Sequence, residues 1–375
     1  MAREHLEVAI AAGGTAGHIN PALALAEELR DRGHHVRFFG QTAKLEGRLV
    51  PEAGFELVPV VVSGFDRERP WTLVSSLARM RRAQSQISRL FSEKGAPDVA
   101  IGFGAYVEMP LLNCCHRAGV PYLLHEQNSV PGLANKALAP HAEAVCISVP
   151  AAREVFERAK RPARRVVLTG NPVRRSVTSA SREAGRAAFG VEPGETMLLV
   201  FGGSLGAAHL NEGVCRLKGE LLSREGVVVV HSTGADGFDE TVAALALTPA
   251  EQLRWRVMPY ISNMGEALAA ADLVLSRAGA SSIAEIAALD VPSLLVPYPH
   301  ATADHQTTNA RFLVDAGAAA LLPDDKIDEP VFAEELLGLV DDPARRERMR
   351  ACARGLGQAH AAAALADQVE AVTRG

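Results

Sequence analysis

Gly13-Gly14-Thr15-Ala16-Gly17 and Gly202-Gly203-Ser204-Leu205-Gly206 are two matching stretches of this sequence, 189 positions apart. Both read G-G-[S/T]-x-G, and each lies between an apolar run typical of a buried strand and a run typical of a helix. A glycine-rich turn that opens a helix presents backbone N–H groups and the positive end of the helix dipole to an anion such as phosphate. Glycines also serve simply to permit a tight turn, but two such turns in register favour a binding role for at least one of them.

The rest of the sequence repeats the same alternation of strands and helices in each half. This alternation predicts an α/β fold with two Rossmann-like domains, each a doubly wound parallel sheet covered by helices on both faces. We expect an N-terminal domain at 1–172, a hinge near Asn171-Pro172-Val173-Arg174, a C-terminal domain at 173–355, and a last helix within 356–375 that packs back on the first domain. The expected strands are Leu6–Ala11, Val36–Phe39, Phe55–Val60, Val99–Phe103, Tyr122–His125, Ala144–Ser148, Met197–Phe201, Val227–Ser232, Arg256–Tyr260, Leu273–Ser276, Ser293–Pro297 and Ala319–Leu322.

The composition argues against several classes of protein. The net charge is −5, and the first 172 residues carry a net charge of only +4, which is too weak to indicate a nucleic-acid partner. The five cysteines show no C-x-x-C spacing, which favours reduced thiols in a cytosolic protein. The N-terminus has no signal-peptide pattern, and no run of about 18 apolar residues predicts a membrane span.

The glycine turns do not match the two commonest nucleotide-binding motifs. In the first turn, Thr15 and His18 occupy the second and third glycine positions of G-x-G-x-x-G, and the second strand ends without the acidic residue that binds a ribose. No G-x-x-x-x-G-K-[S/T] loop occurs either. The sequence therefore disfavours a nicotinamide-dependent dehydrogenase and an ATPase.

Two groups of polar residues in the first half follow predicted strands. His18 comes directly after the first glycine turn, at the start of a helix whose first turn is expected to contain Pro21. The helix dipole there would lower the proton affinity of the imidazole and keep it neutral, able to act as a base. His125-Glu126-Gln127-Asn128 follows an apolar run, at the carboxyl end of a strand, where open α/β sheets bind their ligands.

The second half carries a further candidate anion site. The segment Ser276-Arg277-Ala278-Gly279-Ala280-Ser281-Ser282 joins a predicted strand to a helix, and Glu285 follows within that helix. Glu285 is either the partner of Ser282 in a capping box or a carboxylate that binds the two hydroxyls of a ribose, and the two uses are compatible. No D-x-D motif and no His/Cys cluster with metal-ligand spacing occurs, so we expect no metal ion. Helix dipoles, N–H groups and arginines such as Arg174 would then meet the charge of a diphosphate.

A helix is expected from Trp71 to Phe91. Its polar stripe contains Arg79, Arg82, Gln86 and Arg89, and its apolar stripe contains Leu73, Leu77, Met80, Ile87 and Leu90. This pattern is typical of a core helix with a solvated basic face. It equally allows a surface that docks on anionic lipid, with Trp71 and its neighbours in the membrane interface.

Taken together, these motifs resemble those of the MurG family, the bacterial N-acetylglucosaminyltransferases that convert lipid I to lipid II in peptidoglycan synthesis. Seven stretches carry the resemblance in order from residue 13 to residue 310: GGTAGHINP, FGAYVEMP, HEQN, GNPVR, FGGSLGA, SRAGASSIAE and ATADHQTTNA. The resemblance implies a GT-B fold, in which two Rossmann-like domains face a cleft, with UDP-N-acetylglucosamine as donor, lipid I as acceptor and no cofactor. It also implies a peripheral protein on the anionic cytoplasmic face of the cell membrane, working beside cell-wall synthesis and division proteins.

The resemblance further implies roles for individual residues. For the donor, it places Ser204 and Arg174 at the diphosphate, Ile261 at the uracil, Glu285 at the ribose and Gln306 at the sugar hydroxyls. The nucleotide would be wrapped by Ala280, Ser281, Ser282, Ile283 and Ala284, and the first domain would close over the donor with Thr15, Ala16, Gly17 and Asn128. The positions associated with acceptor binding or catalysis are His18, Tyr106, His125, Glu126 and Asn135. His18 is the preferred general base, and Glu126 is the alternative.

The expected reaction is an attack by the C4 hydroxyl of the muramyl sugar on the anomeric carbon of the donor, with inversion to a β linkage. Two alanines depart from the family pattern: Ala16, where G-G-T-G-G-H is usual, and Ala105, where F-G-G-Y is usual. A methyl group restricts positive φ and puts the local loop geometry in question. Two alternatives stay open: a related enzyme, such as a UDP-N-acetylglucosamine epimerase or a transferase with another acceptor, and a non-catalytic UDP-sugar sensor.

Overall fold

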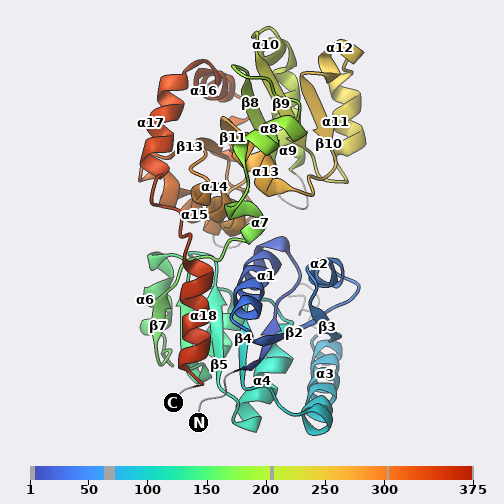
Figure 1. The fold of residues 1–375 in the computed structure, drawn as a ribbon, viewed down its shortest axis with the longest axis vertical. Coiled ribbons are helices and arrows are strands. Elements are labelled where there is room, and N and C mark those ends of the chain that lie inside the picture. Colours follow the sequence, from blue (N-terminus) through green and yellow to red (C-terminus); the bar gives the residue numbers. More distant parts are fainter. Residues whose placement is uncertain (1–4, 63–71, 203–206, 302–303, 374–375) are drawn as a thin grey trace. The chain divides into compact units, whose positions relative to one another are not determined.

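The computed structural model describes residues 5–62, 72–202, 207–301 and 304–373, without the side chains of residues 72–74. The chain forms two compact units (Figure 1). Unit 1 comprises Met1–Arg174 and His360–Gly375, and unit 2 comprises Arg175–Ala359. Trp71 and four residues of the second glycine turn, Gly203, Ser204, Leu205 and Gly206, lie outside the described residues.

Unit 1 is built on a parallel sheet of seven strands in the order β3-β2-β1-β4-β5-β6-β7. Ile10 of the central strand pairs with Phe38 on one side and with Ile101 on the other. The strands are β1 (Glu7–Ala11), β2 (His35–Gly40), β3 (Glu56–Pro59), β4 (Val99–Gly102), β5 (Tyr122–Glu126), β6 (Ala144–Ile147) and β7 (Val166–Leu168). The helices are α1 (Ala16–Asp31), α2 (Glu46–Glu52), α3 (Thr72–Lys94), α4 (Glu108–Ala118), α5 (Leu133–Leu138), α6 (Arg153–Glu157) and α18 (Ala361–Ala371).

The C-terminal helix α18 packs against α1, although more than 300 residues separate them in the sequence (Figure 1). Leu365 and Val369 of α18 are fully buried in the same hydrophobic cluster as Leu25 and Leu29 of α1. Arg32, at the end of α1, forms ion pairs of 2.7 Å with Asp367 and 3.1 Å with Glu370. The last helix is therefore part of unit 1.

Unit 2 repeats this architecture with a parallel sheet of six strands in the order β10-β9-β8-β11-β12-β13. The strands are β8 (Thr196–Phe201), β9 (Val227–Ser232), β10 (Trp255–Met258), β11 (Leu273–Ser276), β12 (Ser293–Leu295) and β13 (Ala319–Leu321). The helices are α7 (Arg175–Thr178), α8 (Arg182–Ala188), α9 (Ala208–Arg216), α10 (Lys218–Leu222), α11 (Phe238–Leu245), α12 (Pro249–Gln252), α13 (Met264–Ala270), α14 (Ala280–Ala288), α15 (His305–Val314), α16 (Pro330–Asp341) and α17 (Pro343–Ala353).

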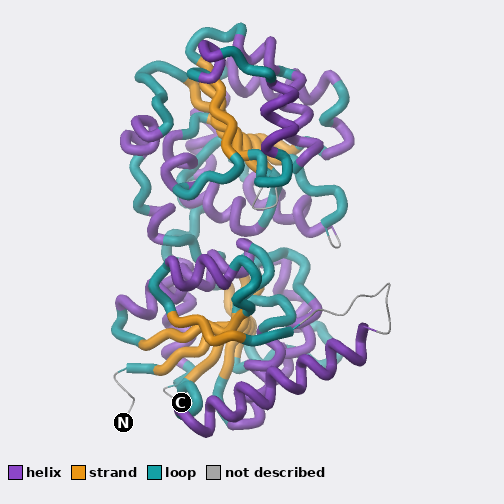
Figure 2. The backbone as a smooth tube through the Cα atoms, turned by 90° about the vertical axis from the view of Figure 1, so that its right-hand side faces the viewer, coloured by secondary structure: helices purple, strands orange, loops and turns teal. Residues whose placement is uncertain are grey.

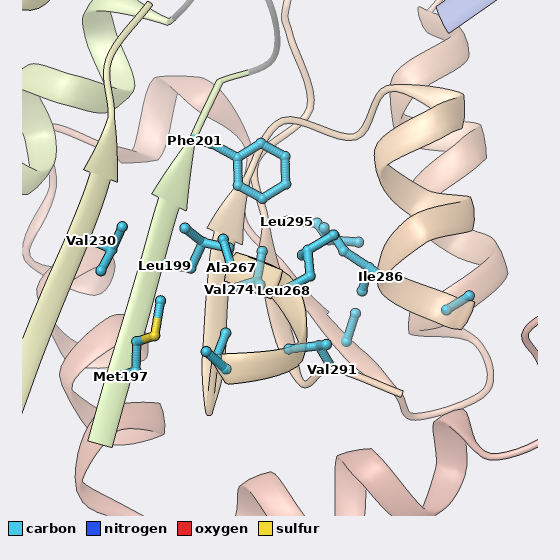
Figure 3. Packing of buried hydrophobic residues seen from close by; sticks show 14 of the residues in the cluster. Met197, Leu199, Phe201, Val230, Ala267, Leu268, Val274, Ile286, Val291 and Leu295 are labelled. Atoms are coloured by element: carbon cyan, nitrogen blue, oxygen red, sulfur yellow. The ribbon is translucent and has the colours of Figure 1, made fainter. Parts of the chain in front are cut away.

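Helices cover both faces of each sheet, so the central strands are buried on both sides (Figure 2). Figure 3 shows one face of the sheet in unit 2, where Leu199 and Val274 of neighbouring strands pack against Leu268 of α13 and Ile286 of α14. The predicted fold class, two doubly wound parallel α/β domains, is confirmed.

Three local predictions were wrong. Helix α1 begins at Ala16, so Pro21 lies inside the helix and not in its first turn. Helix α14 begins at Ala280 after Gly279 as N-cap, so Ser282 is an interior residue and the capping box with Glu285 does not form. Strand β7 was missed because its three residues, Val166–Leu168, are too short a run to show a period.

Among the described residues, no helix combines the length and the apolarity that a membrane span requires.

Candidate functional site

In unit 1 the loops that follow β1 and β4 lie next to each other, because these strands are neighbours in the sheet. The strand order reverses between them, and open α/β sheets bind their ligands at such a point. The first glycine turn follows β1, and the turn Phe103-Gly104-Ala105 follows β4. His125 and Glu126 end the next strand, β5, and Gln127 and Asn128 follow it.

His18 is held between the two turns. Its Nδ1 lies 3.0 Å from Oγ1 of Thr15, the N-cap residue of α1, whose side chain makes no hydrogen bond to the helix backbone. A Cβ atom built on Gly104 would lie 3.1 Å from Cδ2 and 3.3 Å from Nε2 of the ring, so Gly104 packs directly against the imidazole. Burial lowers the pKa of His18 to about 4, and a hydrogen bond with the backbone of Gly13 opposes this shift. The imidazole is therefore neutral at pH 7, with burial rather than the helix dipole as the main cause.

Glu126 is a buried carboxylate at the end of β5. Its Oε1 accepts hydrogen bonds from the backbone N–H of Asn128 at 3.0 Å and from the side-chain amide of Asn128 at 3.4 Å. Its Oε2 accepts from the N–H of Gly132 at 3.0 Å and from Nδ2 of Asn135 at 2.9 Å. Burial raises the pKa of Glu126, whereas these hydrogen bonds lower it. Both oxygens are thus occupied in holding the loop that joins β5 to α5.

His125 is wholly buried beneath this loop. Its Nε2 lies 2.9 Å from the carbonyl oxygen of Gly170, and its Nδ1 lies 3.0 Å from Nε2 of Gln127. The carbonyl can only accept and the amide nitrogen can only donate, so the ring is the tautomer protonated at Nε2. Burial lowers the pKa of His125 to about 4, which keeps this tautomer neutral.

The two remaining residues expected at the acceptor differ in exposure. Tyr106 is 44% exposed, directly after the Gly104 turn. Asn135 is 1% exposed, and its Nδ2 donates to the carbonyl of His125 at 3.2 Å as well as to Glu126. Its Oδ1 has no hydrogen-bond partner among the described residues.

The sequence analysis missed two wholly buried glutamates, Glu46 of α2 and Glu108 of α4. Each accepts a hydrogen bond from the backbone of a glycine turn: Glu46 from Gly14 at 3.1 Å, and Glu108 from Gly104 at 2.6 Å. A signal for Glu108 was present, because it opens an otherwise apolar segment, where burying a carboxyl group is costly without a partner.

The two alanines that replace family glycines have different backbone conformations. Ala16 is the first residue of α1, so the prediction that its methyl group would restrict a positive φ was wrong; the positive φ, 87°, belongs to Gly14. Ala105 has a φ of 66°, a left-handed conformation that costs a non-glycine residue about 1 kcal/mol.

We expect Ala105→Gly to raise the free energy of unfolding by about 1 kcal/mol, because glycine adopts this φ without strain. Ala16→Gly is the matched control and should bring no gain, since glycine disfavours a helical position. Urea unfolding of both variants measures the difference. Equal effects of the two substitutions would contradict the assignment of strain to Ala105.

In unit 2 the expected donor residues follow β10, β11 and β12. The side chain of Ile261 is buried in the core, so only its backbone remains for a ligand. Five of the six residues from Ala280 to Glu285 are partly exposed along the first turns of α14, whereas Ile283 points into the core. Oε1 of Gln306 accepts hydrogen bonds from the N–H groups of Ala278 at 3.1 Å and Tyr298 at 2.9 Å, which fixes its amide at the ends of β11 and β12.

A partly buried ion-pair network, also missed, ties these loops together. Arg277, directly after β11, bonds Asp324 at 2.5 Å, and Asp324 accepts from Nδ1 of His209 at 2.8 Å. His209 lies in the first turn of α9, the helix that follows the second glycine turn. Its hydrogen bond with Asp324 raises the pKa of His209.

Arg174, expected at the diphosphate, belongs to unit 1 in the structure. Its Nε and Nη2 donate to Oε1 of Glu27 in α1, at 3.2 and 3.1 Å.

Two doubly wound parallel α/β units, the first with a glycine turn where its strand order reverses, define the class of two-domain glycosyltransferases. The family models for the N-terminal and C-terminal domains of glycosyltransferase family 28 match residues 8–147 and 197–369. The UDP-N-acetylglucosamine--N-acetylmuramyl-(pentapeptide) pyrophosphoryl-undecaprenol N-acetylglucosamine transferase of Halothermothrix orenii is 36% identical, over 99% of this chain and 100% of its own length. The protein of the same name from Salinibacter ruber is 39% identical, over 96% of this chain and 95% of its own length.

Among solved structures, the crystal structure of MurG from Acinetobacter baumannii is similar, with a TM-score of 0.73 and 28% identity over 98% of this chain and 100% of that one. The chain therefore belongs to the MurG family of glycosyltransferase family 28.

Proposed function

We propose that this protein transfers N-acetylglucosamine from UDP-N-acetylglucosamine to the C4 hydroxyl of the muramyl sugar of lipid I, with inversion, giving lipid II. The observation that carries the proposal is the neutral imidazole of His18 between two glycine turns, in a chain related along its whole length to transferases of this name.

His18 acts as the general base. When the Thr15 hydroxyl accepts a hydrogen bond from Nδ1, the lone pair of the ring lies on Nε2, which can take the proton of the attacking hydroxyl. Glu126 remains the alternative, but the four hydrogen bonds on its carboxylate favour a role in shaping the loop. For His125 we propose a positioning role, since both ring nitrogens are engaged in the interior. Tyr106 and Asn135 contact the acceptor.

Unit 2 binds the donor. The backbone of Ile261 holds the uracil, Glu285 holds the ribose, and the fixed amide of Gln306 meets the sugar hydroxyls. Ser204 and the first turn of α14 stabilise the diphosphate leaving group through N–H groups and the helix dipole. Arg174 neutralises the same group on exchanging its partner Glu27 for the ligand. Thr15, Ala16, Gly17 and Asn128 complete the donor contacts from unit 1.

Acceptor-dependent release of UDP tests the function. We expect UDP and a β-linked disaccharide product when the protein is given UDP-N-acetylglucosamine and a short-chain lipid I analogue, and no UDP without the analogue. UDP release without acceptor would instead indicate the epimerase class. Donor binding in calorimetry without turnover would indicate a sensor.

The surface of α3 is the proposed contact with the membrane. Leu77, expected in the apolar stripe, is 52% exposed, whereas Ile87 is buried against the core of unit 1. Arg79, Arg81 and Arg82 are exposed along the same helix. A lipid-anchored acceptor requires the enzyme to work at a membrane surface, and this basic face with a protruding leucine suits the anionic cytoplasmic leaflet.

Replacing Arg79, Arg81 and Arg82 by glutamine should weaken binding to phosphatidylglycerol vesicles by about 10²-fold, since each arginine near an anionic surface contributes about 1 kcal/mol. Vesicle flotation measures the loss. Arg158→Gln, at an exposed site directly after α6, is the control. Unchanged flotation of the triple variant would rule out this surface.

A further inference from the structure

We propose that Glu108 and Glu46 are positioning residues for transfer: each holds the backbone of one glycine turn, and the two turns together fix the imidazole of His18. The inference rests on the proposed role of His18 as base. It adds Glu46, which lies outside the seven motifs, and Glu108, which lies within FGAYVEMP but was given no role.

Glu108 is fixed by close packing. Its side chain is wholly buried, and its Oε2 accepts the hydrogen bond of 2.6 Å from the N–H of Gly104. A Cβ atom on Gly102, at the end of β4, would overlap this oxygen, so only glycine at that position leaves room for the carboxyl group. The carboxyl group therefore determines where Gly104 lies.

The position of Gly104 in turn restricts the position of the His18 ring. The site of a Cβ on Gly104 is 3.1 Å from the imidazole, which leaves no room between the turn and the ring. Gly104 also has a φ of 86°, a conformation that needs glycine and that the hydrogen bond from its N–H stabilises. Displacing the carboxyl group of Glu108 would therefore free Gly104 to move away from the imidazole of His18.

Glu46 does the same for the opposite turn. Its Oε2 accepts from the N–H of Gly14 at 3.1 Å, and its Oε1 accepts from the N–H of Gln41 at 3.0 Å, so it joins the ends of β1 and β2. A Cβ atom on Gly13 would lie 2.5 Å from Oε1 of Glu46, so a side chain at position 13 would collide with the carboxyl group. Gly14 precedes Thr15, whose hydroxyl contacts Nδ1 of His18.

The charges around Glu108 agree with a purely positioning role. The ionisable groups that interact with it are Glu126 and Tyr122, and neither supplies a positive charge. Burial first, and then repulsion from Glu126, raise the pKa of Glu108 to about 8, whereas the Gly104 hydrogen bond lowers it. Glu108 is therefore a neutral carboxyl group, which glutamine can replace.

Matched substitutions of similar shape test the proposal. In the full-length protein, Glu108→Gln keeps an acceptor for the Gly104 N–H, whereas Glu108→Met fills the same space without one. With UDP-N-acetylglucosamine and a short-chain lipid I analogue, we expect Glu108→Gln to keep kcat within about three-fold and Glu108→Met to lower it at least ten-fold. The KM for the donor should stay within two-fold in both. Glu46→Met should lower kcat likewise, and Glu46→Gln should do so in part, because its amide nitrogen cannot accept the second N–H.

The double variant His18→Ala/Glu108→Met separates this proposal from the proposed function. If Glu108 acts through His18, the double variant should have the kcat of His18→Ala alone, because the two residues then work as one unit. Additive losses, or equal kcat for the methionine and glutamine variants, would overturn the positioning role while leaving His18 as base. A normal kcat for His18→Ala would overturn the proposed base itself. Should Glu108→Met fail to fold, Glu108→Asp replaces it, because it draws the carboxyl group back by one methylene. Its kcat, alone and combined with His18→Ala, is then compared in the same way.

Discussion

His18→Ala is expected to lower kcat for acceptor-dependent transfer by about 10²- to 10⁴-fold, the usual contribution of a general base. The KM for the donor should change less than two-fold, because the donor residues proposed here lie mainly in unit 2. Since burial lowers the pKa of His18 to about 4, the imidazole is already neutral at pH 5. The acid limb of the profile of kcat/KM against pH should therefore fall below pH 5 rather than near pH 6.5.

Steady-state kinetics of UDP release between pH 4.5 and 9 measure both effects. Glu126→Gln is the comparison that matters, since Glu126 is the alternative base. It should disturb the loop it holds and reduce kcat, but keep the acid limb that belongs to His18. If Glu126→Gln abolishes activity while His18→Ala retains it, the two residues exchange roles. Thr15→Val removes the hydroxyl that contacts Nδ1 of His18. Its kcat should lie between that of His18→Ala and that of the natural protein.

The second large effect concerns stability. Between pH 5 and pH 8 the free energy of unfolding of unit 1 should fall, relative to Glu108→Gln, by about 3 to 4 kcal/mol. Burial raises the pKa of Glu108 to about 8, so over this interval the folded state keeps a proton that the unfolded chain releases. Stability is therefore highest at acid pH and is lost as the pH rises toward 8, where the folded state ionises too. Glutamine carries no such proton, so the variant lacks this slope.

Urea unfolding at a series of pH values, followed by pulsed hydrogen exchange and mass spectrometry of peptides from β1 and β4, reports on unit 1 separately from unit 2. The raised pKa of Glu126 is present in both the natural protein and Glu108→Gln, so its effect on stability cancels in their difference. Glu93→Gln, at an exposed site of α3, controls for the substitution itself. Parallel curves for the natural protein and Glu108→Gln would show that Glu108 is ionised in the folded state at neutral pH.

Much of the fold could be predicted because the signals for it are local. Apolar runs such as Ala144–Ser148, bounded by polar segments, predict strands buried on both faces, and a glycine turn after the first strand of each half predicts the repeated architecture. Candidate residues such as His18 and Glu126 were found for the same reason, since each directly follows a predicted strand or glycine turn.

The local signals failed where distant segments decide the outcome. Leu77 has the spacing of a core residue, but it is exposed in the structure, because the packing of α3 on unit 1 does not cover this position. Ser282 and Glu285 have the spacing of a capping box, but the N-cap residue of α14 is Gly279, three residues before Ser282. His125 ends a predicted strand, where open α/β sheets bind ligands, yet its ring is buried against Gly170, which lies 45 residues away.

The sequence alone was therefore sufficient for the two α/β halves and the glycine turns, because periodicity and turn chemistry act between residues close in the chain. The surroundings of His18 depended on strand order, which makes β1 the neighbour of β4 and so brings Gly104 against the imidazole. Burial of Glu46 and Glu108 depended on the same packing, because a carboxyl group is buried at tolerable cost only where folding supplies an N–H group to meet it.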